Sequence, residues 1–219
     1  MNLNQLIPTA LIAATVLASF AAFNNSALME RYQFQVGRIR YSKQYDRLLS
    51  SGFVHNDWMH LFFNMLTLYF FSPVIIMVYG VFVFLALYLG AIVAGNAFSL
   101  WLYKTRPGYT AVGASGGVSG ILFASISLDP LNGILFFFIP MTAWIFATLY
   151  FAYSVTMLLR PRPWDNIGHA AHLGGAVVGM LCVAVLSPYF FARNIVYISI
   201  MSLPLLYLAY ELLFNKKVR

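Results

Sequence analysis

Long apolar stretches, separated by short polar segments, run through almost the whole chain. A helix that crosses the hydrocarbon core of a bilayer needs about 20 predominantly apolar residues. Stretches near this length lie at 6–23, 57–72, 77–101, 114–129, 133–158, 167–187 and 194–214. The connection around Ser72-Pro73 is short, which predicts that the second and third helices are antiparallel neighbours. The pattern predicts an all-α, polytopic membrane protein.

We expect the chain to form one membrane domain over residues 1–219, with a six-helix core at about 6–187. No Lys or Arg precedes Arg31, whereas a cleavable signal peptide normally begins with basic residues, so the first stretch is expected to be a retained span. The last stretch contains Pro204 and Glu211. Its length favours a seventh transmembrane helix, and a helix lying at the membrane interface is the alternative.

Composition agrees with a membrane protein. The chain is 61% hydrophobic and only 9% charged, against about a quarter charged residues in a soluble domain. The net charge of +7 comes from Lys and Arg between the apolar stretches, not from a stripe along one element, so it indicates lipid head groups and not nucleic acid. The single cysteine, Cys182, lies within an apolar stretch and is interpreted as a small buried hydrophobe.

The first polar cluster is the glycine-rich segment 113–120, which surrounds Ser115 at the start of the fourth stretch. Glycines leave a serine hydroxyl uncovered, and a helix N-terminus offers free N–H groups that can stabilise an oxyanion. Gly116, Gly120 and Ala124 are four residues apart, the spacing of small residues at membrane helix interfaces. On its own, the cluster fits helix packing better than catalysis.

A second cluster, 169–175, opens the sixth stretch and contains His169 and His172. Small residues repeat here too, at Ala171, Gly175 and Gly179. If these two smooth faces pack together, a serine hydroxyl comes within reach of an imidazole, so packing and catalysis are compatible here.

A third polar group precedes and enters the second stretch. His60 and Asn64 are four apart and share one face of the predicted helix, while His55 lies just before it. Both His60 and Asn64 can donate hydrogen bonds to a developing negative charge, and an ordinary interhelical hydrogen bond is the equally weighted alternative.

No acid lies where a catalytic triad requires one. Asp129 is at the far end of the serine helix, about 20 Å away at 1.5 Å per residue, and Asp165 lies in a loop seven residues before His172. The sequence therefore predicts a Ser-His dyad. A proton-coupled transporter that uses the intramembrane histidines is another hypothesis. The lack of an intramembrane acid in the six-helix core weakens it.

Four motifs in this order resemble the rhomboid family of intramembrane serine proteases: Tyr45-Asp46-Arg47-Leu48-Leu49, His55-x4-His60-x3-Asn64-Met65, Gly113-x-Ser115-Gly116 and Ala171-His172-x2-Gly175. The resemblance covers about 45–187. It implies a serine endopeptidase without cofactor or metal, which cleaves substrates in or near their transmembrane segments.

The resemblance also implies roles. Ser115 would be the nucleophile, His172 the general base, and His60, Asn64 and the Ser115 N–H the oxyanion hole. We further expect structural or mouth-lining roles for four residues: His55, His169, Gly113 and Gly175. The family often has an aromatic residue four positions after the nucleophile that packs on the catalytic histidine. Here that position is Ser119, so the sequence determines the orientation of His172 less firmly.

Ser119 is also a second candidate nucleophile, and Ser115 is favoured because it lies nearer the helix N-terminus. The alternative function is a non-catalytic rhomboid-like protein that binds membrane clients.

We expect the protein to lie in a cell (inner) membrane. The resemblance places the segments 24–56, 102–112 and 159–166 on the side of this membrane that does not face the cytoplasm. Nine of the thirteen basic residues lie there, and the positive-inside rule favours the reverse orientation. Expected partners are transmembrane protein substrates and the lipid bilayer, and the oligomeric state is left open.

Overall fold

The computed structural model describes residues 2–136 and 138–215. Seven longer helices carry the fold: α1 (Leu3–Phe23), α5 (Trp58–Tyr79), α6 (Val81–Leu102), α7 (Ser115–Leu128), α8 (Ala143–Leu159), α9 (His169–Leu186) and α11 (Ile195–Tyr210). Short elements join them: α2 (Ser26–Tyr32), β1 (Phe34–Gln35), α3 (Val36–Ser42), α4 (Arg47–Ser50), a 3₁₀ turn (Ser51–Phe53), β2 (Thr110–Ala111), β3 (Gly133–Phe136), β4 (Ile139–Thr142), α10 (Pro188–Arg193) and a π turn (Glu211–Asn215).

Five helices of the described chain are long and apolar enough to cross a membrane: α1, α5, α6, α9 and α11 with its π-turn continuation to Asn215. The predicted all-α, polytopic fold is therefore confirmed, and the stretch at 194–214 does form a helix of spanning length. In contrast, α7 has 14 residues and α8 has 17. At about 1.5 Å per residue, α7 is shorter than the hydrocarbon core is thick, so it cannot reach from one face of that core to the other.

Two sequence expectations about helix ends were wrong. The turn expected at Ser72-Pro73 does not occur, since α5 continues through Pro73 and the chain turns at Gly80, where φ is 82°. This left-handed conformation suits glycine. The stretch 133–158 is not one helix, because β3 and β4 form an antiparallel hairpin that pairs Leu135 with Pro140. Pro140 lacks an N–H, which the edge strand of a two-stranded hairpin tolerates, and α8 begins at Ala143, directly after β4.

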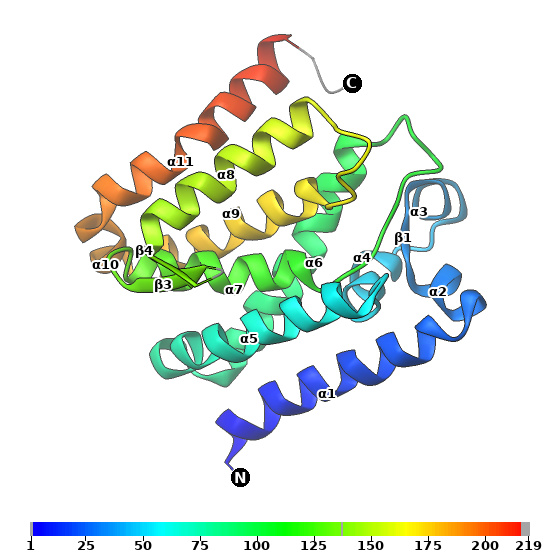
Figure 1. Cartoon of the computed structure of the whole chain (residues 1–219), viewed down its shortest axis with the longest axis horizontal. Coiled ribbons are helices and arrows are strands. Elements are labelled where there is room, and N and C mark those ends of the chain that lie inside the picture. Colours follow the sequence, from blue (N-terminus) through cyan, green and yellow to red (C-terminus); the bar gives the residue numbers. More distant parts are fainter. Residues whose placement is uncertain (1, 137, 216–219) are drawn as a thin grey trace.

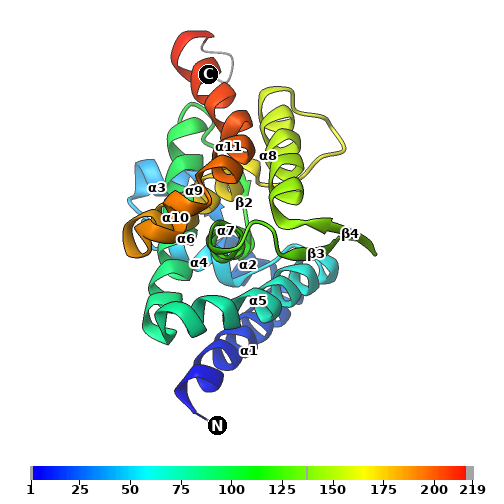
Figure 2. The ribbon, with the colours of Figure 1, turned by 90° about the vertical axis from the view of Figure 1, so that its left-hand side faces the viewer.

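The serine helix α7 occupies the centre of the molecule. Figure 1 shows α1 and α5 on one side of it and α8 and α11 on the other, and Figure 2 shows α7 end-on among its neighbours. Every residue from Gly116 to Ser127 is buried. A helix enclosed in this way faces protein on all sides, so its polar N-terminus is shielded from lipid.

Backbone contact between α7 and α9 confirms the predicted packing of two small-residue faces. A Cβ on Gly175 would overlap the Gly116 carbonyl oxygen, and one on Gly179 would overlap that of Gly120. Helix α9 also approaches α6 closely, because a Cβ on Gly95 would overlap the Ala171 carbonyl oxygen. Glycine is required at these positions because the helices approach backbone to backbone.

Candidate active site

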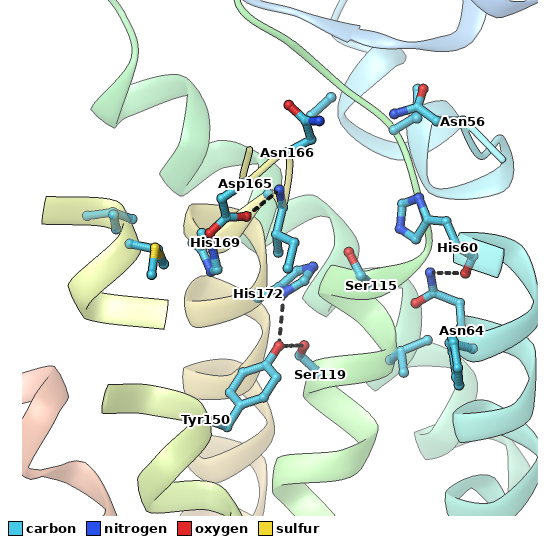
Figure 3. Close-up of a pocket in the computed structure, with 18 of the residues that line it drawn as sticks. Asn56, His60, Asn64, Ser115, Ser119, Tyr150, Asp165, Asn166, His169 and His172 are labelled. Carbon is cyan, nitrogen blue, oxygen red and sulfur yellow. Dashed lines mark hydrogen bonds and ion pairs between the residues drawn. The ribbon is translucent and has the colours of Figure 1, made fainter. Parts of the chain in front are cut away.

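A pocket of about 710 Å³ opens at the N-terminal end of α7. Its wall includes Ser115 from α7, His172 from α9, and His60 and Asn64 from α5 (Figure 3). The loops before α7 and before α9 form its rim, with Arg106 among the lining residues. The four polar side chains named by the sequence motifs thus come from three helices into one cavity.

Ser115 is the first residue of α7. Its position leaves the backbone N–H groups of the first turn without helical partners, and their dipoles favour negative charge at this end. Figure 3 shows Ser115 and His172 beside each other on facing helices, and among the described residues no hydrogen bond joins them. Catalytic hydrogen bonds are often long in an unliganded site and tighten when substrate binds.

The start of α7 is fixed by His55, which is completely buried. The Ala114 N–H donates to His55 Nε2 at 3.2 Å, and His55 Nδ1 lies 2.9 Å from the Ser19 hydroxyl. That hydroxyl donates to the Phe53 carbonyl at 3.1 Å, so it accepts from Nδ1–H. His55 must therefore be neutral. Burial, followed by the nearby His60, lowers the pKa of His55 to about 3, which keeps the ring neutral.

This geometry fits the structural one of the two roles expected for His55. His55 was expected either to support the mouth or to line it. It lies behind the pocket wall, where it ties α1 to the residue before Ser115, because both ring nitrogens are engaged by buried partners.

On the α5 side, the Asp57 carboxylate caps the helix by accepting the His60 N–H at 2.8 Å. The His60 ring stands edge-on to that of His55, with 4.9 Å between centroids. Gly113 makes room for the His60 ring: its φ is 120°, and a Cβ there would lie 2.5 Å from the ring carbon Cε1. Asn64 donates one amide hydrogen to the His60 carbonyl at 3.0 Å. An amide has two donor hydrogens, so one is left over.

The imidazole of His172 is held from α8. Its Nδ1 lies 2.9 Å from the hydroxyl of Tyr150, and that hydroxyl lies 3.2 Å from the Ser119 hydroxyl (Figure 3). The two rings are nearly parallel, 21° apart, with centroids separated by 6.2 Å. The sequence did not single out Tyr150. The available signal was a hydroxyl-bearing ring inside an apolar stretch, where polar groups are rare and need partners.

His169 and Asp165 form a separate pair at the rim. Asp165 accepts from His169 Nε2 at 2.9 Å, from the Tyr153 hydroxyl at 3.2 Å and from the Ile167 N–H at 3.0 Å. Burial opposes ionisation of Asp165, but the hydrogen bonds from His169 and Ile167 outweigh it and lower the carboxyl pKa. Asp165 therefore holds the loop before α9 onto the head of that helix and does not contact His172.

Within the described residues, no three His, Cys, Asp or Glu side chains gather closely enough to hold a metal ion. The arrangement is instead that of a hydroxyl, an imidazole and two neutral hydrogen-bond donors around one cavity. Such a set can deprotonate a serine, attack a carbonyl carbon and hold the resulting oxyanion.

Comparison with known proteins identifies relatives whose names include the word rhomboid. Rhomboid protein 1, mitochondrial, of Saccharomyces cerevisiae is 35% identical over 141 residues, which are 61% of this chain and 40% of that protein. RHOMBOID-like protein 12, mitochondrial, of Arabidopsis thaliana is 30% identical over 187 residues, 78% and 55% of the two chains. The human Presenilin-associated rhomboid-like protein, mitochondrial, is 32% identical over 139 residues, 61% and 36%.

The chain spans about 40%, 55% and 36% of the length of these three relatives. Their names place them in mitochondria, so they give no support to the expectation of a cell membrane. The Rhomboid domain family model matches residues 42–189, which include all four sequence motifs. With its polytopic helical fold, the chain therefore belongs to the rhomboid family of integral membrane proteins.

Proposed function

We propose that the protein is an intramembrane serine endopeptidase that cleaves membrane-protein substrates in or near their transmembrane segments. One observation supports this above all: Ser115, His172, His60 and Asn64, on three different helices, line the same pocket. Shared membership of a family does not by itself assign chemistry to a site, so the proposal depends on this convergence. The whole described chain acts as one membrane domain in the proposal.

In the proposed reaction, His172 Nε2 takes the proton of the Ser115 hydroxyl while Oγ attacks the scissile carbonyl carbon. The tetrahedral oxyanion accepts hydrogen bonds from His60, from Asn64 and from the Ser115 N–H. As the C–N bond breaks, the protonated His172 gives its proton to the leaving amine. Water, activated in turn by His172, then hydrolyses the acyl-enzyme and restores the serine.

The proposed nucleophile can be tested by labelling the detergent-solubilised protein with a serine-directed fluorophosphonate. The wild type should form a covalent adduct, and Ser115→Ala should abolish both labelling and cleavage of a model transmembrane substrate. Ser125→Ala is a matched control, since this buried serine of α7 only donates to the Ile121 carbonyl. It should keep both activities.

Ser119→Ala decides between the two candidate serines. Ser119 is buried one turn deeper and its hydroxyl contacts Tyr150, so this variant should still be labelled. Labelling that survives Ser115→Ala and disappears in Ser119→Ala would reverse the assignment. A folded wild type without any adduct would instead favour a non-catalytic, client-binding rhomboid-like protein.

A further inference from the structure

Tyr150 occupies the position beside His172 that an acid occupies in a catalytic triad. Its hydroxyl contacts Nδ1, the ring nitrogen that does not serve the serine in the proposed mechanism. Asp165, the nearest candidate acid along the chain, is engaged by His169, Tyr153 and the Ile167 N–H. In the described residues, the hydrogen-bond partner of His172 Nδ1 is therefore a neutral phenol and not a carboxylate.

The direction of these hydrogen bonds follows from the role of the base. A neutral His172 that accepts a proton at Nε2 carries its hydrogen on Nδ1. Nδ1–H then donates to the Tyr150 oxygen, and the Tyr150 O–H, which needs an acceptor of its own, donates to the Ser119 Oγ. His172 therefore donates to Tyr150, and Tyr150 donates to Ser119. The opposite tautomer would reverse the direction of both hydrogen bonds and leave Nε2 protonated.

Packing keeps the phenol in this position. The Tyr150 ring lies nearly parallel to the imidazole and also packs against Phe123 of α7 and Phe146 of α8, at centroid distances of 5.3 Å and 5.9 Å. Since χ1 and χ2 of a tyrosine are confined by such contacts, its hydroxyl is held at a fixed point. A rigid acceptor is what an imidazole requires to keep one orientation.

We propose that Tyr150 is a positioning residue that fixes the tautomer and orientation of His172, with Ser119 fixing the hydroxyl of Tyr150 in turn. This inference rests on the proposed function. The proposed role of Tyr150 differs from a purely structural one, because His172 Nδ1–H still needs its acceptor after His172 has taken the serine proton. The contact is therefore needed in the transition state as well as in the resting enzyme.

The test is Tyr150→Phe, which removes the hydroxyl and keeps the ring. Cleavage of a model transmembrane substrate should show kcat reduced about tenfold, because the lost hydrogen bond is stronger in the transition state, where His172 is charged, than in the resting enzyme, where it is neutral. KM should be unchanged. The rate of fluorophosphonate labelling at Ser115 should fall by the same factor. Combining Ser119→Ala with Tyr150→Phe should add little further loss, since the two hydroxyls act in one chain.

Tyr79→Phe is the matched control. Tyr79 also donates its hydroxyl to a serine across an element boundary, Ser187 at 2.8 Å, but it lies outside the pocket. It should keep the wild-type kcat and labelling rate, so it measures the general effect of losing such a bond. Thermal unfolding of both variants shows whether they are folded to the same degree.

The outcomes separate the two proposals. If the wild type is labelled at Ser115 and Tyr150→Phe has the same labelling rate and kcat, the role of Tyr150 is wrong and the protease assignment stands. A Tyr150→Phe variant with raised KM and normal kcat would identify a substrate contact instead, which also overturns positioning. If the wild type forms no adduct, the proposed function and this inference fall together.

Discussion

Two of the helix faces that meet α7 are built in different ways. Toward α9 the contact is between backbones, and Gly175 lies against the Gly116 carbonyl. Toward α8 the contact is between side chains, where Phe123 stacks on Phe151 at 4.3 Å and Tyr150 reaches Ser119. The α9 face sets the distance between the serine and histidine helices, whereas the α8 face orients a single side chain, that of His172.

This difference teaches which part of the site tolerates change. Backbone contact leaves no room for relaxation, because only movement of a whole helix can relieve an overlap. Side-chain contacts can lose a single hydroxyl or methyl group while the helices stay in place. Substitutions on the α9 face should therefore abolish activity, and those on the α8 and rim side should reduce it by smaller factors.

The largest effect is expected for Gly175→Ala. The new methyl group overlaps the Gly116 carbonyl and forces α7 and α9 apart, and overpacking of this kind typically destabilises by about 1–3 kcal/mol or more. We expect cleavage below about 0.1% of wild type, a loss of more than about 1,000-fold or about 4.1 kcal/mol in barrier. Gly90→Ala is the control, because no atom lies near its Cβ position. Comparable activity in the two variants would contradict the backbone-contact account.

A smaller loss is expected for Asn64→Ala, on the third helix of the site. Removing one oxyanion donor costs about 10²–10³ in kcat, while the fold is kept. Asn24→Ala is matched to it, because the Asn24 amide makes the same contact with a carbonyl four residues earlier, at 3.2 Å, in an exposed position. Steady-state cleavage assays compare the two. Wild-type rates in Asn64→Ala would remove this residue from the oxyanion hole.

Protonation of His55 should weaken the anchoring of α7. Burial and the neighbouring His60 hold the folded-state pKa of His55 at about 3, against about 6.5 in an unfolded chain. Between these values the unfolded chain binds a proton that the folded chain does not, so stability falls as the pH decreases. We expect a loss of about 2 kcal/mol from pH 7 to pH 5.

Unfolding in detergent at both pH values measures this loss, in the wild type and in His55→Gln. The variant should be less stable than the wild type at pH 7, since the Ala114 N–H loses its imidazole acceptor. It should nevertheless show a shallower decline toward pH 5. An equal decline in both proteins would show that another group titrates.

The smallest effect is expected for Asp165→Asn. Its amide oxygen can still accept from His169 and Tyr153, and the residue does not contact His172. We predict that kcat stays within about threefold of wild type. In Ser-His-Asp triads, the corresponding change costs about 10⁴. A loss of that size here would show that Asp165 acts with Ser115 and His172 as a triad. It would also show that the activity depends more on the rim of the pocket than on α8.

The sequence predicted best what depends on local pattern. Glycine around Ser115 and four-residue spacing at Gly175 gave the serine helix and its partner, because close helix packing requires small residues at regular intervals. The length of an apolar stretch could not distinguish a helix from the strands at 133–136 and 139–142, since apolar residues can form either element. Tyr150 escaped notice because its partners are 22 and 31 residues away on other helices, and one sequence carries no record of such contacts.

The order of the elements along the chain has a consequence for biosynthesis. The proposed oxyanion-hole side chains belong to α5, the serine to α7, the phenol to α8 and the base to α9, which follows the other three along the chain and is therefore synthesised last. A nascent chain that ends before residue 169 therefore holds a serine without its base. On the proposed mechanism, the partly synthesised protein cannot cut neighbouring membrane proteins, or itself, until the final helix of its active site has been delivered.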